Sequence, residues 1–372
     1  MMYWVVNIIS VCVLCIIFAG IIIPQILLIA FRKDLYDVPN ERKIHKARVP
    51  RLGGIAFKPV IFFSIVFILG CNLALGYNDI LVLFERDGLA VSFGFCAIMM
   101  LYLTGMADDL IGIRYRAKFV IQIICGIMLI IGGNWLNNLH GVFFIYHLSE
   151  WYGYPLALLV IVFIVNSMNL IDGIDGLASG LSSVAVILYG ITFFLVGDYL
   201  YSLVSFATLG VLIPFFYYNV FGDPEKHKKI FMGDTGSLTV GLLVSILSLR
   251  MSMYPKDVTW GINPFVLAFI PLLIPCFDVV RVYIHRVRHR KNPFLPDKNH
   301  IHHKLLALGM NQRIAMILII SASVALCLLN IFLSRLININ LLLLMDIIAW
   351  IFVNSWIFKK IQKKRIHDVT VY

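Results

Sequence analysis

Long apolar stretches alternate with short polar connections along the whole chain. Eleven of these stretches are long enough, at about 20 residues, to cross a hydrocarbon core. Backbone polar groups have no water partners in lipid, so each stretch is expected to be a helix. The pattern therefore predicts an all-α, polytopic membrane protein with about eleven transmembrane helices. Their expected ranges are 3–31, 55–76, 88–107, 118–133, 153–171, 176–195, 199–220, 236–255, 262–284, 312–334 and 338–358.

The composition agrees with this pattern. Hydrophobic residues make up 60% of the chain and charged residues 14%, far from the proportions of ordinary soluble domains. No connection is long or polar enough to form a separate soluble domain, so residues 1–372 are expected to form a single integral-membrane domain. The seven cysteines are scattered, mostly within apolar stretches, where cysteine acts as a small hydrophobic residue.

Lysine and arginine are divided unevenly between the two sides of the predicted bundle. When alternate connections are assigned to opposite sides, one side carries 27 of the 31 basic residues. Basic connections stay in the cytoplasm, which predicts an outside N-terminus, an uncleaved first span and a cytoplasmic C-terminus. The net charge of +11 follows from this bias and from attraction to anionic lipid heads, so nucleic acid is not an expected partner. The cytoplasmic connections are expected near 32–54, 108–118, 171–176, 221–235 and 285–311.

One of these connections begins with the segment NSMNLIDGIDGLASG, residues 166–180, directly after an apolar run. Asn166, Asn169 and Asp172 follow at steps of three, which places them on one helical face, and Asp175 is three residues further on. Asp is a good helix cap, but capping needs only one such side chain. Two carboxylates and two amides at one helix end therefore favour a functional site.

Carboxylates also gather in two other connections. Asp108 and Asp109 follow a span directly, and at the C-terminal end of a helix the dipole disfavours negative charge. The pair therefore needs a cation or a proton. Asp234, in FMGDTGS, begins another span on the same side, where a helix cap is the alternative interpretation. This segment lacks the lysine of the P-loop, which excludes that nucleotide-binding motif.

Three histidines, His300, His302 and His303, lie in the last connection among six Arg and Lys residues. Their spacing is not that of a zinc site, and no matching thiol or carboxylate set is near in the sequence. Basic side chains with histidines suit a phosphate ligand, with lipid head groups as the alternative for the basic run. Carboxylates for Mg²⁺, cations for phosphate and a membrane location together predict phosphoryl transfer with a lipid reactant.

These motifs resemble those of the polyprenyl-phosphate N-acetylhexosamine-1-phosphate transferases. DDLIGIRYRAK, NSMNLIDGIDGLASG, FMGDTGSL and PFLPDKNHIHHKL follow in the expected order, after RKIH and VPRLGG in the first connection. The His-Ile-His-His pattern is similar to that of the branch that begins O-antigen, enterobacterial common antigen or teichoic-acid linkage units. The resemblance implies an enzyme of the bacterial inner membrane, with its active site on the cytoplasmic face, that begins assembly of a cell-surface polysaccharide.

The resemblance also implies the reaction and its participants. A UDP-N-acetylhexosamine, with GlcNAc as the expected sugar, gives its sugar-1-phosphate to undecaprenyl phosphate, and UMP is released. The expected partners are undecaprenyl phosphate, the UDP-sugar and membrane lipids, with a second copy of the chain as a candidate protein partner. The expected cofactor is Mg²⁺, for which Mn²⁺ can substitute.

Residue roles follow from the same resemblance. Asp234 and Asn169 would hold Mg²⁺, Phe231 would stack on uracil and Asp175 would accept its imide N–H. Lys118 and the histidines would contact phosphates. The catalytic residues implied are Asp108, Asp109, Asp172, His300, His302 and His303, and the substrate-binding residues are Lys118, Asn166, Asp175 and Phe231.

Two other protein classes are the alternatives. An intramembrane aspartyl protease also uses two membrane aspartates, one of them in a GxGD motif. Here Phe231 stands in place of the first glycine, and a protease would leave the histidines unexplained. A lipid or solute transporter is expected to carry its polar residues near the bilayer midplane, whereas these residues cluster at one surface.

Overall fold

Helices make up most of the chain in this computed structural model, which describes residues 1–36, 49–290 and 299–370. No β-strand occurs in those ranges, and a single bridge joins Asn138 to His147. The helices are α1 (Met2–Arg32), α2 (Phe57–Ala74), α3 (Asp79–Arg86), α4 (Gly88–Ile111), α5 (Tyr115–Ile131), α6 (Glu150–Ile171), α7 (Leu177–Val196), α8 (Tyr199–Val220), α9 (Gly233–Ser252), α10 (Pro264–Phe269), α11 (Leu273–Arg288), α12 (Ile301–Ala307), α13 (Gln312–Leu333) and α14 (Ile339–Thr370), with 3-10 turns at Gly53–Ala56, Val142–Phe144 and Ile270–Leu272.

Ten membrane-spanning candidates are present in the described ranges, and they coincide with ten of the eleven expected stretches. The remaining expected stretch, 118–133, corresponds to α5. This helix has 17 residues, which is at the lower limit of about 17 residues for a membrane span. The prediction of an all-α polytopic protein is therefore confirmed. The RKIH motif of the first connection lies outside the described residues.

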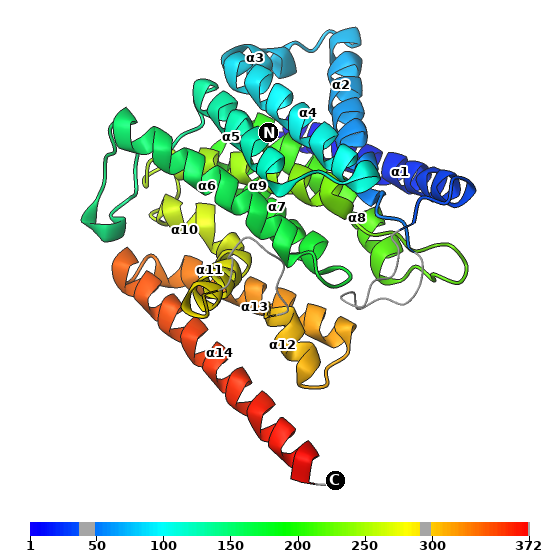
Figure 1. The fold of residues 1–372 in the computed structure, drawn as a ribbon. Coiled ribbons are helices and arrows are strands. Elements are labelled where there is room, and N and C mark those ends of the chain that lie inside the picture. Colours follow the sequence, from blue (N-terminus) through cyan, green and yellow to red (C-terminus); the bar gives the residue numbers. More distant parts are fainter. Residues whose placement is uncertain (37–48, 291–298, 371–372) are drawn as a thin grey trace.

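One predicted span is broken. The expected stretch 262–284 forms α10, then a 3-10 turn at Ile270–Leu272, then α11. Pro271 lies in that turn, and proline neither donates a backbone hydrogen bond nor fits against the preceding helical turn. Figure 1 shows α11 leaving the direction of α10. Apolar patterning predicts only one span here, and the break redirects the part of the chain that precedes the histidines.

Helix α9 lies at the centre of the bundle, where it packs against α4 and α6 (Figure 1). It is rich in Gly, Ser and Thr, and small side chains let neighbouring helices approach closely. Its hydroxyl groups donate to carbonyls of the preceding turn, as Thr239 does to Thr235 O at 2.6 Å. Within its most apolar window, 94% of the residues are buried. The start of α9, which carries Asp234, is therefore held by neighbours on several sides.

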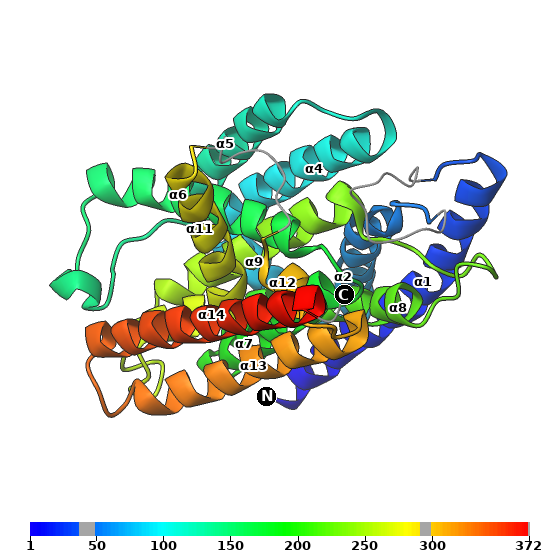
Figure 2. The same cartoon turned by 60° about the horizontal axis from the view of Figure 1, so that its bottom comes forward.

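Helix α14 lies at the edge of the bundle. Only 17% of its apolar window is buried, as expected for a helix that faces lipid on most sides. Its C-terminal part extends beyond the bundle and passes α12 (Figures 1 and 2). There Lys364 Nζ donates to Leu308 O at 3.3 Å, and Lys304 Nζ donates to Asn354 Oδ1 at 3.2 Å. Thus α14 supports the short helix that carries two of the three histidines.

Candidate active site

Connections that are far apart in the sequence meet at one end of the bundle. The backbone N–H of Phe231 donates to Pro50 O at 2.9 Å, which joins the first connection to the fourth. The buried amide of Asn219 accepts from Gly176 N–H at 2.6 Å and donates to Ile230 O at 2.8 Å, which joins the third connection to the fourth. The predicted cytoplasmic connections are therefore neighbours in space.

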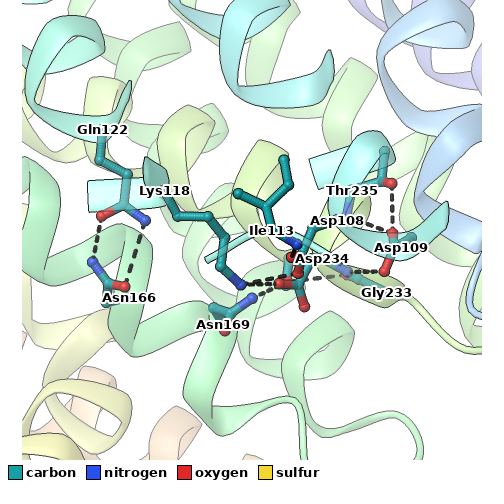
Figure 3. A network of polar contacts seen from close by, with 11 residues as sticks. Asp108, Asp109, Ile113, Lys118, Gln122, Asn166, Asn169, Gly233, Asp234 and Thr235 are labelled. Atoms are coloured by element: carbon teal, nitrogen blue, oxygen red, sulfur yellow. Dashed lines mark hydrogen bonds and ion pairs between the residues drawn. The ribbon is translucent and has the colours of Figure 1, made fainter. Parts of the chain in front are cut away.

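Lys118, in the first turn of α5, lies between two carboxylates (Figure 3). Its Nζ is 2.9 Å from Asp108 Oδ2, at the end of α4, and 2.6 Å from Asp234 Oδ2, at the start of α9. Asp108 also accepts the backbone N–H of Ile113 at 2.5 Å. A carboxylate at the C-terminal end of α4 needs a cation, and in this structure Lys118 supplies it.

Asp109 points toward the start of α9 (Figure 3). One of its oxygens accepts Asp234 N–H at 2.8 Å, and the other accepts both the N–H of Thr235 at 2.8 Å and its hydroxyl at 2.6 Å. The first N–H groups of a helix have no partner within that helix, and the positive end of the helix dipole stabilises a carboxylate. Asp109 therefore caps α9 from a neighbouring helix and holds the backbone of Asp234.

Gly233 makes this close approach possible. Its φ is +69°, in the left-handed region where glycine carries no steric penalty. A Cβ at this position would lie 2.1 Å from Arg51 O and 2.5 Å from Asp109 Oδ2. The glycine of the MGD sequence therefore stands where the chain turns into α9 directly beside its cap.

The end of α6 supplies an amide and a carboxylate to the same region. Asn169 Nδ2 donates to Ser237 Oγ at 2.9 Å, on the first turn of α9. Asp172 ends α6, its side chain is exposed, and it forms no hydrogen bond or ion pair with any residue that the structure describes. Asn166 instead pairs with Gln122 of α5, 2.6 Å from Nδ2 to Oε1, to one side of the carboxylates (Figure 3).

The electrostatic environment of Asp172 favours a bound cation. Desolvation by the surrounding protein, and repulsion from Asp234 and Asp175, raise the pKa of Asp172 to about 7 against the attraction of Arg51. In the described ranges, no three Asp, Glu, His or Cys side chains are arranged to hold a metal ion by themselves. Mg²⁺ needs only one or two protein oxygens when substrate phosphates complete its coordination. This donor set therefore fits Mg²⁺.

Asp175 is paired with Lys229, a residue that no sequence motif marks. Lys229 Nζ lies 2.6 Å from Asp175 Oδ2, and both side chains are largely buried. The pair forms part of the wall of a pocket of about 510 Å³, which Phe221 and Arg313 also line. Phe231 is half-buried in the segment that follows Lys229.

The histidines gather at the start of α12. His300 and His302 are buried, with parallel rings whose centroids lie 5.7 Å apart, and the His303 ring is 4.3 Å from that of His302. The His302 ring packs onto Gly173, where a Cβ would lie only 2.2 Å from Nε2. The last connection is therefore in contact with the segment that carries Asp172 and Asp175.

His302 is enclosed as a neutral group. Both of its ring nitrogens are buried without a hydrogen-bond partner. Burial, together with the nearby His303 and His300, lowers the pKa of His302 to about 3. In this arrangement the ring fills the space above Gly173 and its nitrogens do not reach the surface.

Comparisons with known proteins show to which family the sequence belongs. The sequence profile of glycosyl transferase family 4 matches residues 91–252. A probable undecaprenyl-phosphate N-acetylglucosaminyl 1-phosphate transferase of Bacillus subtilis (strain 168) is 35% identical over 304 residues, which cover 80% of this chain and 77% of the relative. The chain belongs to the polyprenyl-phosphate N-acetylhexosamine-1-phosphate transferases. It also matches the undecaprenyl-phosphate alpha-N-acetylglucosaminyl 1-phosphate transferases of two other bacteria, each 30% identical. The match to that of Escherichia coli (strain K12) covers 79% of this chain and 75% of the relative. The match to that of Yersinia pestis covers 83% of this chain and 79% of the relative.

Family membership confirms the resemblance found in the motifs, and this transferase is an enzyme of the membrane. The protease and transporter alternatives are not favoured. The matched region 91–252 contains Asp108, Lys118, Asp172 and Asp234, whereas the three histidines lie beyond it.

The candidate site also contains residues that motif reasoning missed. Asp278 of α11 is fully buried against His300, and a lone carboxylate inside an apolar stretch was a signal for it. Lys229 and Asn219 carried no such signal, because their partners lie in other connections. Arg286, one of the basic residues of the run for which lipid head groups are the alternative partner, is only 6% exposed within the protein. Two other basic residues of the run, Lys291 and Lys298, lie outside the described residues.

Proposed function

We propose that the protein transfers GlcNAc-1-phosphate from UDP-GlcNAc to undecaprenyl phosphate. A bond forms between an oxygen of the lipid phosphate and the sugar-bearing β-phosphorus of the donor. The bond from that phosphorus to the bridging oxygen breaks, and UMP leaves. The observation that carries the proposal is the convergence of Asp108, Lys118, Asp172 and Asp234 at one end of the bundle. The names of the relatives support both the acceptor and the sugar.

The proposed roles follow from this arrangement. Asp234 and Asn169 would hold Mg²⁺ with Asp172 close by, and the ion would supply positive charge against the charge that develops on the phosphates. Asp109 keeps Asp234 at the start of α9. A lipid phosphate is already anionic near pH 7, so Asp108 does not have to remove a proton and instead holds Lys118, the cation that contacts phosphate.

The nucleotide is proposed to bind at the third and fourth connections. Asp175 accepts the imide N–H of uracil and Phe231 stacks on the base. The Lys229–Asp175 ion pair supports this role, because it holds the carboxylate in place before the nucleotide binds. The basic connections support a site on the cytoplasmic face of the bacterial inner membrane, where nucleotide sugars are made. A homodimer stays a prediction.

Removal of the metal ion tests the centre of this proposal. Purified enzyme with labelled UDP-GlcNAc and undecaprenyl phosphate should lose turnover in excess EDTA and regain it with Mg²⁺ or Mn²⁺. Asp234→Asn should lower kcat by about 100- to 1,000-fold, because a preorganised charge at the transferring phosphate is lost. Asp257→Asn is the matched control, because Asp257 is exposed and lies beyond the C-terminal end of α9, whereas Asp234 lies at its start. Full turnover in EDTA would show that the reaction needs no divalent ion.

A panel of donors tests the sugar. Membranes that contain the enzyme should convert UDP-GlcNAc to lipid-linked product faster than UDP-GalNAc or UDP-QuiNAc. A preference for either of the other sugars would overturn the assignment of GlcNAc while leaving the transfer reaction itself intact.

A further inference from the structure

Asp278 is a carboxylate in the interior of a membrane span. It lies in α11, beyond the break at Pro271, and its side chain is 0% exposed. An ionised group there is unstable unless it is paired and hydrogen-bonded. One of its three partners, Arg281, lies one turn further along α11, with its guanidinium 2.7 Å from Asp278 Oδ1. The other two partners, His300 and Ile301, belong to the connection that carries the histidines.

The contact with His300 orients an imidazole ring. Asp278 Oδ2 lies 2.8 Å from His300 Nδ1. A carboxylate only accepts hydrogen bonds, so Nδ1 carries the proton of this pair. The other ring nitrogen, Nε2, is not among the buried unpaired atoms of the described residues, in contrast to both nitrogens of His302. Asp278 therefore determines which nitrogen of His300 faces inward, and Nε2 is the nitrogen left for another partner.

The backbone on both sides of His300 is held by the same pair of residues. Asp278 Oδ1 accepts the N–H of Ile301, the first residue of α12, at 3.0 Å. Arg281 donates a hydrogen bond to the carbonyl of Asn299. The residues before and after His300 are thus both fixed to α11, so neither the ring nor the chain that bears it is free to turn.

We propose that Asp278 is a positioning residue for the transfer reaction and that it acts through His300. It holds the imidazole with Nδ1–H directed into the protein and Nε2 directed to a substrate phosphate, which accepts a hydrogen bond from Nε2–H when the ring carries both protons. This inference rests on the proposed function, which supplies the phosphate. Asp278 itself does not touch substrate, and Arg281 balances its charge.

A double-mutant cycle tests whether Asp278 acts through His300. Asp278→Asn keeps the size of the side chain but loses its charge, and kcat should fall by about 10- to 100-fold, as for other groups that orient a functional histidine. KM for UDP-GlcNAc should change by less than about threefold, since the imidazole acts in the transition state. His300→Ala should lower kcat at least as much. The variant with both substitutions should match His300→Ala within about twofold, because no ring is left to orient.

The control is another buried acid. Asp346 of α14 is 9% exposed and accepts from Asn330 Nδ2 at 3.1 Å, without contact to the histidines. Asp346→Asn should leave kcat within about twofold of wild type. Thermal unfolding in detergent should show that Asp278→Asn and Asp346→Asn are both folded at the temperature of the assay. Losses from Asp278→Asn and His300→Ala that multiply in the double variant would overturn the proposal, because Asp278 would then act independently of His300.

Two further experiments cover the cases in which a variant does not fold or the donor is not UDP-GlcNAc. If Asp278→Asn does not fold, Asp278→Asn/Arg281→Gln replaces it in the cycle, since removing both charges leaves no unpaired charge in the interior, and Arg281→Gln is then the reference, because Arg281 also holds the carbonyl of Asn299. If wild-type enzyme does not use UDP-GlcNAc, the proposed donor is wrong. The cycle is then measured with the UDP-sugar that the enzyme accepts, and non-additivity still decides the role of Asp278.

Discussion

At the scale of single residues, Lys118 balances the charge of the site. It holds together two carboxylates from α4 and α9 that would repel each other without it. Lys118→Met should therefore lower kcat by about 100-fold or more, as expected when one preorganised charge is removed from a phosphoryl-transfer site. Turnover of purified enzyme with labelled UDP-GlcNAc measures the effect.

A neighbouring cation provides the control for this experiment. Arg116 lies in the same turn of α5, but its side chain is exposed. Arg116→Met should leave kcat close to that of wild type, because surface charges contribute little. Equal losses in Lys118→Met and Arg116→Met would mean that general positive charge matters, and not the bridge between Asp108 and Asp234.

His302 makes stability depend on pH. Its pKa is lowered from 6.5 to about 3 in the folded protein. As pH falls below 6.5, the unfolded chain binds a proton at this ring and the folded chain does not, so stability is lost progressively from pH 6.5 towards about pH 3. The Tm of wild type in detergent should therefore fall more between about pH 7 and pH 5 than the Tm of His302→Gln. His147→Gln, at an exposed position, should retain the wild-type slope. Identical slopes for all three proteins would contradict this origin.

At the scale of elements, the start of α9 depends on a glycine that has neighbours on two sides. Gly233 and Gly197 both have positive φ, but only Gly233 has atoms in the space that a Cβ would enter. Both Ala substitutions incur the left-handed strain of about 1–2 kcal/mol. Gly233→Ala should cost more than Gly197→Ala in the free energy of unfolding, and it should also lower kcat, because Asp234 moves with the helix start.

Thermal or denaturant unfolding of the two glycine variants measures this difference directly. The strain from φ is common to both, so any excess in Gly233→Ala reports on the packing of α9 against Arg51 and Asp109. If the two variants were equally stable and equally active, the approach of Asp109 to the start of α9 would not constrain the site.

At the scale of the whole molecule, the orientation in the membrane can be tested with sealed vesicles. The carboxylates and histidines lie at the end of the bundle where the basic connections meet, and basic connections stay in the cytoplasm. Right-side-out vesicles given external UDP-GlcNAc should therefore make no lipid-linked product until they are permeabilised, whereas inverted vesicles should make it at once. Product formation in intact right-side-out vesicles would reverse the predicted orientation.

Much of the fold and part of the site could be predicted from the sequence. Helical spans are determined by local composition, because any long apolar stretch must satisfy its backbone internally in lipid. Polar residues in so apolar a chain are costly, which is why the Asp108–Asp109 pair, the 166–175 segment and Asp234 stand out as candidate functional residues. The break at Pro271 that precedes α11 was missed, because an apolar run gives the same pattern whether its helix is straight or bent.

Only the tertiary structure decided which of these residues act on one another. Lys118 and Asp234 are 116 positions apart, and Asp109 is 125 positions from the residue whose N–H it accepts. No local pattern encodes such pairs, because a side chain takes whichever partner the packing of α9 against α4 brings within hydrogen-bond distance. The burial of Asp278 beneath His300 has the same origin. The sequence by itself determined that the protein lies in a membrane, where its helices are, and which kinds of side chain are available to the candidate site. Helix packing decided which of these side chains are partners, because contact depends on distance in space and not along the chain.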